Sequence, residues 1–198
     1  MKIKICGITN LEDAICACES GADALGFVFY EKSPRYISPE KAAQIIAEMP
    51  PFVQSVGLFV NNSANEINEI AKISTIDLAQ IHFEMAQDEL AKLQIKHLKV
   101  VRATQKSDIL NFENEYKIID AFVDNFGGEG KRLNLDWFDS VDCSKIIIAG
   151  GLDEKNLAEL DGFGFYGVDV SSGVEISKGI KSHEKIINFI KAANEIYR

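Results

Sequence analysis

The sequence predicts a single-domain (β/α)8 barrel that spans residues 1–198. Two observations lead to this fold class. Eight short apolar segments alternate with eight segments of helical pattern, and glycine, proline or helix-capping residues mark the changes between them. No shift in composition marks a second domain. The chain is near the lower length limit for eight βα units, so an open doubly wound sheet is the structural alternative.

The expected strands are short and rich in β-branched residues. In the first, isoleucine alternates with other residues, whereas residues 24–29 form the nearly continuous apolar run typical of a parallel strand buried on both faces. The expected strands are residues 2–6, 24–29, 53–60, 76–81, 97–101, 118–123, 145–149 and 165–170.

Capping residues indicate where several helices begin. Thr9 and Glu12 have the spacing of a capping box, as do Ser63 and Glu66, and a Ser-Pro pair at 38–39 supplies an N-cap and a first-turn proline. The expected helices are residues 10–20, 38–48, 63–72, 87–94, 107–113, a short piece near 137, 153–160 and 183–197.

Composition restricts the partners. A net charge of −9 argues against nucleic acid, and no apolar run reaches the length of a membrane span, so neither partner is expected. The four cysteines lack paired metal-ligand spacing, which favours free thiols in a reducing compartment and no metal site. We therefore expect a cytoplasmic protein, either a monomer or a homodimer.

The first strand carries the first candidate for catalysis. Ile3 and Ile5 alternate with Lys4 and Cys6, so the lysine and the thiol share one face of the strand. Gly7 then permits a tight turn toward a helix. The thiol is thereby placed at the carboxyl end of a parallel strand, where the active sites of barrels lie. The alternative is that Cys6 is a small buried apolar residue.

Side chains and loops from the other strand ends should gather with Cys6 at one mouth of the barrel. They are Arg35, His82, Arg102, Asp124, Gly150, Gly151, Ser171, Ser172 and Gly173. The glycine- and serine-rich loops after the last two strands offer backbone N–H groups and hydroxyls, which suit a phosphate, although ordinary turns have the same composition. Asp124 could form an acid–base pair with Cys6, or be a helix cap or a solvated acid, and His82 could be a satisfied strand-end histidine.

Eight stretches along the whole chain match one known family. They are residues 4–9, 21–29, 32–39, 56–61, 80–82, 127–131, 149–152 and 168–175. On these stretches the sequence resembles phosphoribosylanthranilate isomerase, a (β/α)8-barrel enzyme family of tryptophan biosynthesis. Such a set in order along the chain is much more specific than any single motif.

The resemblance implies an Amadori rearrangement of a phosphosugar, from an aminoaldose phosphate to an aminoketose phosphate. It implies Cys6 as general base and Asp124 as general acid, with Arg35 holding the anthranilate carboxylate. His82 and Arg102 complete the expected substrate-binding residues. No cofactor is implied, because the imine intermediate is itself the electron sink. The implied phosphate site consists of Gly128, Gly150, Gly151, Ser171, Ser172 and Gly173.

Alternation also predicts a buried ion pair. If Cys6 points inward, Lys4 does too, and a buried ammonium needs a partner. The last strand of a closed barrel lies beside the first, and there Asp169 alternates with two valines. We expect Lys4 to pair with Asp169 and to favour the thiolate of Cys6. The alternative is that Lys4 reaches solvent through the barrel floor.

Two other functions stay open on the sequence alone. A different sugar-phosphate isomerase or synthase would share the phosphate loops but would not need Cys6 and Asp124 together. A non-catalytic phosphosugar-binding protein would gain nothing from an acid–base pair. The presence of both residues favours an enzyme.

Overall fold

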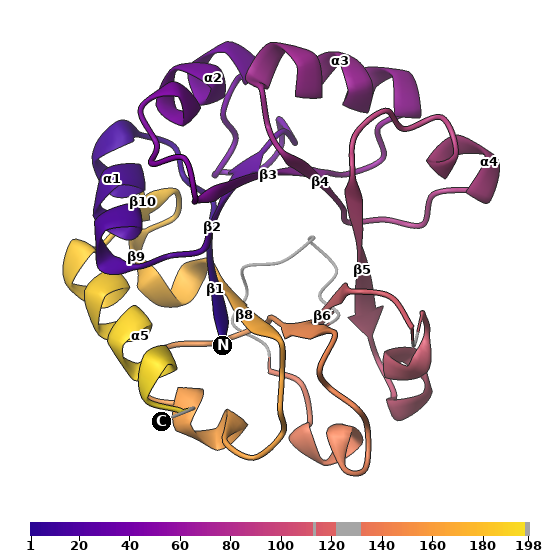
Figure 1. The fold of residues 1–198 in the computed structure, drawn as a ribbon, viewed down its shortest axis with the longest axis vertical. Helices are drawn as coiled ribbons and strands as arrows, with labels where there is room; N and C mark the ends of the chain where they lie inside the picture. The colour runs from indigo at the N-terminus through magenta and orange to yellow at the C-terminus, as the bar shows by residue number, and fades with distance from the viewer. Residues whose placement is uncertain (113, 122–131, 197–198) are drawn as a thin grey trace.

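Eight parallel strands close into a barrel in the computed structural model, which confirms the expected fold class (Figure 1). The structure describes residues 1–112, 114–121 and 132–196. Neighbouring strands pair in chain order around the ring, and β1 closes it against β8. Helices and turns surround the ring, so the strands are enclosed between an inner and an outer layer of side chains (Figure 1).

All eight barrel strands overlap the ranges expected from the sequence. They are β1 Lys2–Cys6, β2 Ala24–Val28, β3 Gln54–Phe59, β4 Leu78–Ile81, β5 His97–Ala103, β6 Lys117–Ala121, β7 Ile146–Ile148 and β8 Gly167–Val170. Two further strands, β9 Glu175–Ser177 and β10 Ile180–Lys181, form an antiparallel hairpin that the sequence analysis did not predict. This hairpin follows the loop after β8 and becomes important at the site.

The helices differ in length between the two halves of the chain. The α-helices are α1 Leu11–Ser20, α2 Pro39–Ala47, α3 Ala64–Ser74, α4 Gln87–Leu90 and α5 His183–Glu195. Short 3-10 helices are η1 Lys106–Leu110, η2 Leu135–Phe138, η3 Leu157–Leu160 and η4 Ser172–Val174. Among the described residues, no helix is long and apolar enough to cross a membrane.

The capping predictions were right for two helices and wrong for the first. Ser63 and Glu66 form the expected capping box, and Ser38 caps α2. At α1, however, Asn10 is the N-cap, because its side chain accepts a hydrogen bond from the Asp13 N–H. The Thr9 hydroxyl instead donates to the carbonyl of Gly179, which ties the loop after β1 to the β9–β10 hairpin.

The expected helix at 153–160 is also wrong in its first turn. The Asp153 carboxylate accepts hydrogen bonds from the N–H groups of Lys155 and Asn156. These are the bonds of the predicted cap, but residues 154–156 form a turn and only the 3-10 helix η3 follows. The expected helices at 87–94 and 107–113 are likewise reduced, to the single turn of α4 and to η1.

The barrel interior is apolar at its amino-terminal end and polar toward the carboxyl ends of the strands. The apolar part is a compact cluster of Val56, Leu78, Leu98, Ile118 and Ala149. Gln80 and Asp120 lie two residues beyond Leu78 and Ile118 on the same strands, so they form the next layer. The apolar cluster therefore serves as a floor beneath the polar side chains.

Lys4 and Asp169 form the predicted buried ion pair across the closing strands. The register of β1 and β8 sets the two residues opposite each other, and Lys4 Nζ lies 2.9 Å from Asp169 Oδ1. Only 7% and 8% of the two side chains are exposed, which rejects the alternative that Lys4 reaches solvent. Burial opposes the charge, yet Asp169 and then Cys6 raise the pKa of Lys4 above its ordinary value.

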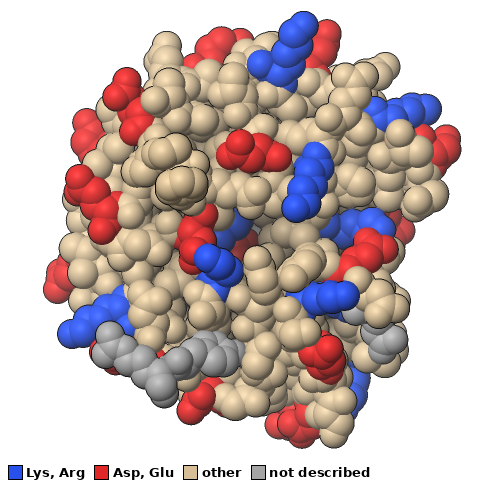
Figure 2. Space-filling model, in the orientation of Figure 1, with Lys and Arg blue, Asp and Glu red and all other residues tan. Residues whose placement is uncertain are grey.

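Acidic and basic side chains alternate over the face shown in Figure 2. The described residues of this face form no continuous basic area. This distribution agrees with the net charge of −9 and gives no support on this face to a nucleic-acid partner.

We predict that Lys4→Met lowers the free energy of unfolding by roughly 3–5 kcal/mol, because it leaves a buried carboxylate without its cation. The double variant Lys4→Met/Asp169→Leu should recover much of this loss, since it removes both charges. Urea unfolding followed by circular dichroism measures each value. Equal stability of Lys4→Met and the wild type would show that the ion pair does not hold the barrel.

Candidate active site

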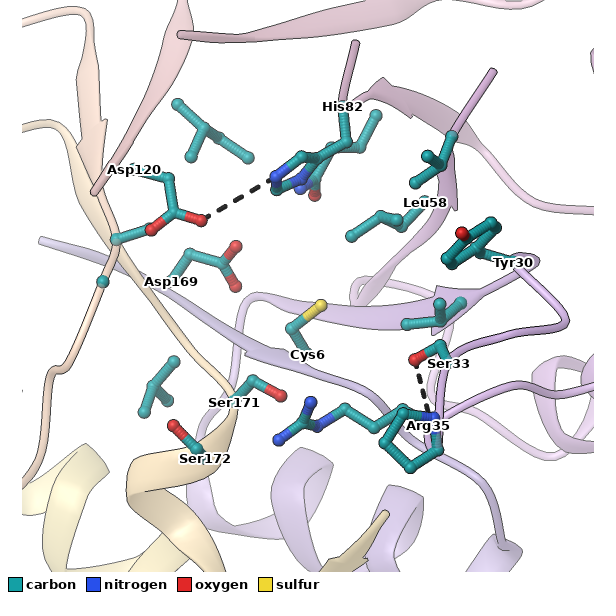
Figure 3. A pocket seen from close by; sticks show the side chains of 18 of the residues that line it. Cys6, Tyr30, Ser33, Arg35, Leu58, His82, Asp120, Asp169, Ser171 and Ser172 are labelled. Carbon is teal, nitrogen blue, oxygen red and sulfur yellow. Dashed lines mark hydrogen bonds and ion pairs between the residues drawn. The ribbon is translucent and has the colours of Figure 1, made fainter. Parts of the chain in front are cut away.

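A cavity of about 540 Å³ opens at the carboxyl ends of the strands (Figure 3). It brings together many of the residues expected at this mouth. Those in its lining are Cys6, Arg35, His82, Gly150, Gly151, Ser171 and Ser172. Asp169 also lines the cavity. Asp124 and Gly128 lie outside the described residues.

Cys6 is buried at the end of β1, with its thiol in the cavity. Gly26, its partner on β2, leaves room for it: a Cβ there would lie 2.7 Å from Cys6 Sγ and 3.1 Å from Lys4 Nζ. Burial raises the pKa of the Cys6 thiol, and Asp169 adds to the rise. Lys4 and Lys181 oppose the rise, so the lysines act in the expected direction but burial outweighs them.

Asp120 is an acid in this cavity that the sequence analysis did not predict. It points inward from β6, and its Oδ2 lies 3.9 Å from Nε2 of His82 (Figure 3). Burial raises the pKa of Asp120 to about 6, with a further contribution from Asp169. The Ala121 N–H, Arg102 and Lys4 act in the opposite direction. With a pKa of about 6, roughly a tenth of Asp120 is protonated at pH 7, far more than of an ordinary aspartate, which suits a general acid.

A sequence signal for Asp120 did exist. The residue interrupts an apolar run and is in phase with Ile118, which faces the barrel interior. The expected strand continued through Val123, which moved the supposed strand end, and with it the acid, to Asp124. Residues 122–124 lie outside the described part of the chain, and within that part β6 covers Lys117–Ala121.

His82 is buried one residue beyond the end of β4. Burial lowers its pKa to about 4, and the positive charges of Arg102 and Lys4 contribute. Its imidazole is therefore neutral at neutral pH, with one nitrogen as donor and the other as acceptor. Arg102 lies on β5, in register with Asp120 on β6, and is not among the residues that line the cavity. It affects His82 and Asp120 through its charge.

Arg35 is held in place by Glu175, a residue to which the sequence analysis gave no role. Arg35 Nε and Nη2 donate to the two carboxylate oxygens of Glu175, both at 2.7 Å. Glu175 Oε1 also accepts from Lys181 Nζ at 3.0 Å. Although burial opposes ionisation, Arg35 and Lys181 keep the pKa of Glu175 below its ordinary value. The β9–β10 hairpin thus fixes the arginine, whose guanidinium extends toward Ser171 (Figure 3).

The loops after β7 and β8 bring glycines and serines to the cavity. Gly150 and Gly151 have φ values of 92° and 61°, which side chains seldom adopt. Gly173 does not line the cavity but lets the two loops pack together, since a Cβ there would lie 1.9 Å from the Leu152 carbonyl oxygen. Small residues and hydroxyls therefore surround a space suited to an anion.

The cavity has two chemical zones. In one, the carboxylates of Asp120 and Asp169 lie on one side of Cys6 (Figure 3), and Gln80 also contributes to the lining. In the other, the guanidinium of Arg35 lies beside the hydroxyls of Ser171 and Ser172 (Figure 3). Such a site suits a molecule whose ends are anionic and whose centre carries hydroxyl or amine hydrogens.

The family model described as N-(5′-phosphoribosyl)anthranilate (PRA) isomerase matches residues 3–192 of the chain. The chain belongs to this family. The isomerases of Nitratiruptor sp. and Sulfurovum sp. are 56% and 53% identical to it. These matches cover 98% of the chain and 98% of the first relative, and 99% of the chain and 100% of the second.

Solved structures of PRA isomerases agree with the fold. That from Thermotoga maritima has a TM-score of 0.89 and 40% identity, over 98% of this chain and 99% of its own. That from Thermus thermophilus has a TM-score of 0.89 and 30% identity, over 99% and 100%. A PRA isomerase in complex with reduced 1-(o-carboxyphenylamino)-1-deoxyribulose 5-phosphate has a TM-score of 0.85 and 40% identity, over 98% and 99%.

We predict that Glu175→Gln lowers the free energy of unfolding by roughly 3–5 kcal/mol, because two buried cations lose their shared anion. Because the pKa of Glu175 is depressed by folding, the wild type should lose the same contribution as pH falls through that pKa. Glu184→Gln, at an exposed position on α5, is the matched control. Similar melting temperatures for the two variants would remove Glu175 from the support of this site.

Proposed function

We propose that the chain converts N-(5′-phosphoribosyl)anthranilate to 1-(2-carboxyphenylamino)-1-deoxyribulose 5-phosphate, a step of tryptophan biosynthesis, with Cys6 as general base and Asp120 as general acid. Family membership supports the reaction. The observation that carries the two roles is that a thiol and a carboxyl with a pKa near 6 line one cavity from different strands. A relative is described in complex with reduced 1-(o-carboxyphenylamino)-1-deoxyribulose 5-phosphate, which supports a phosphosugar substrate.

Asp120 begins the reaction at the furanose ring. Its carboxyl donates a proton to the ring oxygen, the bond from that oxygen to C1′ breaks, and the nitrogen lone pair forms a C1′=N bond. The proton moves without a large barrier if the acid is partly protonated at the working pH, and a pKa of about 6 meets this condition. The resulting carboxylate is stabilised by the N–H of Ala121 and by Arg102, both of which favour its charged form.

Cys6 completes the rearrangement. Its thiolate removes the proton from C2′. The C2′–H electron pair forms a C1′=C2′ double bond, and the π pair of the C1′=N bond returns to nitrogen, which gives an enolamine. Loss of the proton from the C2′ hydroxyl and protonation at C1′ then give the ketone. The protonated imine accepts the electron pair, so this step calls for no cofactor. Lys4 and Lys181 favour the thiolate against the effect of burial.

The two ends of the substrate match the donor-rich zone. Arg35 uses two of its five N–H groups on Glu175, which leaves another edge of the guanidinium for the anthranilate carboxylate. The phosphate is assigned to the loops of Gly150–Gly151 and Ser171–Ser172, where backbone N–H groups and hydroxyls surround the cavity. These contacts hold C1′ and C2′ between the acid and the base.

Location and assembly are part of the same proposal. We infer a cytoplasmic enzyme that acts as a monomer or a homodimer. A Thermotoga maritima relative with a TM-score of 0.83 and 38% identity is described as dimeric and as converted to monomers. Sedimentation at several protein concentrations measures which state this chain adopts.

We predict that Cys6→Ser reduces kcat by roughly 10²–10⁴-fold with an unchanged circular dichroism spectrum, because a hydroxyl is a much weaker base than a thiolate. The loss of the substrate's fluorescence gives the rate. Cys16→Ser, on the outer helix α1, controls for the general effect of removing a thiol. Turnover of Cys6→Ser within a few-fold of this control would exclude Cys6 as the base.

We predict that Asp120→Asn reduces kcat/KM by roughly 10²–10⁴-fold, since an amide cannot donate the proton. The active form needs a thiolate at Cys6 together with a proton on Asp120, and the pKa of the thiol is the higher of the two. In the wild type, kcat/KM should therefore rise with pH up to the Asp120 pKa of about 6 and then level off, and the variant should lose this inflection. Asp124→Asn is the informative control, because the sequence analysis assigned the acid to that position. A larger loss in Asp124→Asn than in Asp120→Asn would transfer the role to Asp124.

A further inference from the structure

The side-chain oxygen of Gln80 is a buried acceptor that has no hydrogen-bond partner in the described part of the chain. The residue is only 1% exposed. Its register neighbours on β3 and β5 are Leu58 and Leu98, whose side chains offer no donor. A buried amide oxygen without a partner costs folding free energy, and natural proteins keep such groups mainly where another molecule supplies the donor.

Gln80 lines the catalytic cavity together with Cys6 and Asp120. On β4 it lies two residues before His82, on the same face and one repeat nearer the barrel floor. His82 in turn lies 3.9 Å from Asp120, so Gln80 shares its strand face with a residue beside the proposed acid.

The neighbouring groups determine what kind of atom Gln80 should meet. Asp169 accepts from Lys4, and Asp120 donates when it acts as the acid, so the Gln80 oxygen is left to accept a hydrogen from the bound molecule. In the proposed substrate, the amine nitrogen is bonded to C1′, the atom from which the ring oxygen departs. The Gln80 oxygen therefore fits the amine hydrogen, next to the oxygen that Asp120 protonates.

We propose that Gln80 accepts a hydrogen bond from the amine N–H of the substrate and stabilises that group as it becomes a protonated imine. The inference rests on the proposed function. The hydrogen bond strengthens as positive charge develops on nitrogen, so it favours ring opening more than substrate binding. It also selects a nitrogen-linked sugar phosphate over an oxygen-linked one, whose bridging atom carries no hydrogen.

Gln80→Met tests the proposal, because methionine has a similar length and fits between the two leucines without an acceptor. We expect kcat to fall by roughly 10- to 150-fold, as for loss of a hydrogen bond to a charged group, while the melting temperature stays equal or rises. Inhibition by inorganic phosphate should not change, since the glycine loops are untouched. Gln80→Leu repeats the test with a second apolar side chain.

The outcomes distinguish a failure of the proposed reaction from a failure of the proposed role of Gln80. A wild type that does not convert N-(5′-phosphoribosyl)anthranilate would overturn the proposed function itself. An active wild type with equally active Gln80→Met and Gln80→Leu would overturn only the role of Gln80. A lower melting temperature in both variants, with phosphate inhibition lost along with turnover, would show that Gln80 merely supports the fold.

A second measurement identifies the hydrogen that Gln80 contacts. Reduced 1-(o-carboxyphenylamino)-1-deoxyribulose 5-phosphate carries the amine N–H, and its N-methyl derivative does not. For each protein, the ratio of the dissociation constants of the N-methyl and N–H compounds is measured. We expect this ratio to be larger for the wild type than for Gln80→Met. The same ratio in both proteins would overturn the assignment to the amine and would point to a sugar hydroxyl.

Discussion

The ion pair between Lys4 and Asp169 is the constraint on which the site depends. It joins the first and last barrel strands, and register and burial fix both side chains. Lys4 extends along the same strand face as Cys6 and lowers the pKa of that thiol, whereas Asp169 raises the pKa of Asp120. One structural contact at the closure of the barrel therefore influences both the proposed base and the proposed acid.

A second buried carboxylate organises the other zone of the cavity. Glu175 binds Arg35 through two hydrogen bonds and also accepts from Lys181, so the cations are placed before any substrate arrives. Glycines make room for these side chains, since a Cβ at Gly7 would lie 2.7 Å from Cδ of Arg35. Such preorganisation reduces the rearrangement needed when an anion binds.

Local periodicity explains which features could be predicted from sequence. Alternation along β1 correctly predicted that Lys4 and Cys6 share the inner face, because it needs only neighbouring residues. Asp120 was missed because the apolar run continues past it to Val123, which directed the prediction to Asp124. Glu175 was missed because its partner Arg35 is 140 residues away, and no local pattern records such a contact. The β9–β10 hairpin, only five strand residues in all, lacked a recognisable alternation.

The relation between the two proposed catalytic pKa values explains why the surrounding charges matter. The reaction needs a thiolate at Cys6 and a proton on Asp120 at the same time, yet the thiol pKa is raised and that of Asp120 is about 6. When the two groups share one proton, it lies mostly on the Cys6 thiol, whereas the active form has it on Asp120. The fraction of enzyme in this active form is small and stays constant at pH values between the two pKa values. Each unit by which Lys4 and Lys181 lower the thiol pKa, or Asp169 raises that of Asp120, increases this fraction about tenfold. Lys4 also lowers the pKa of Asp120, and Asp169 also raises that of Cys6. The fraction that reacts therefore depends on how much more strongly Lys4 acts on the thiol than on Asp120, and on how much more strongly Asp169 acts on Asp120 than on the thiol.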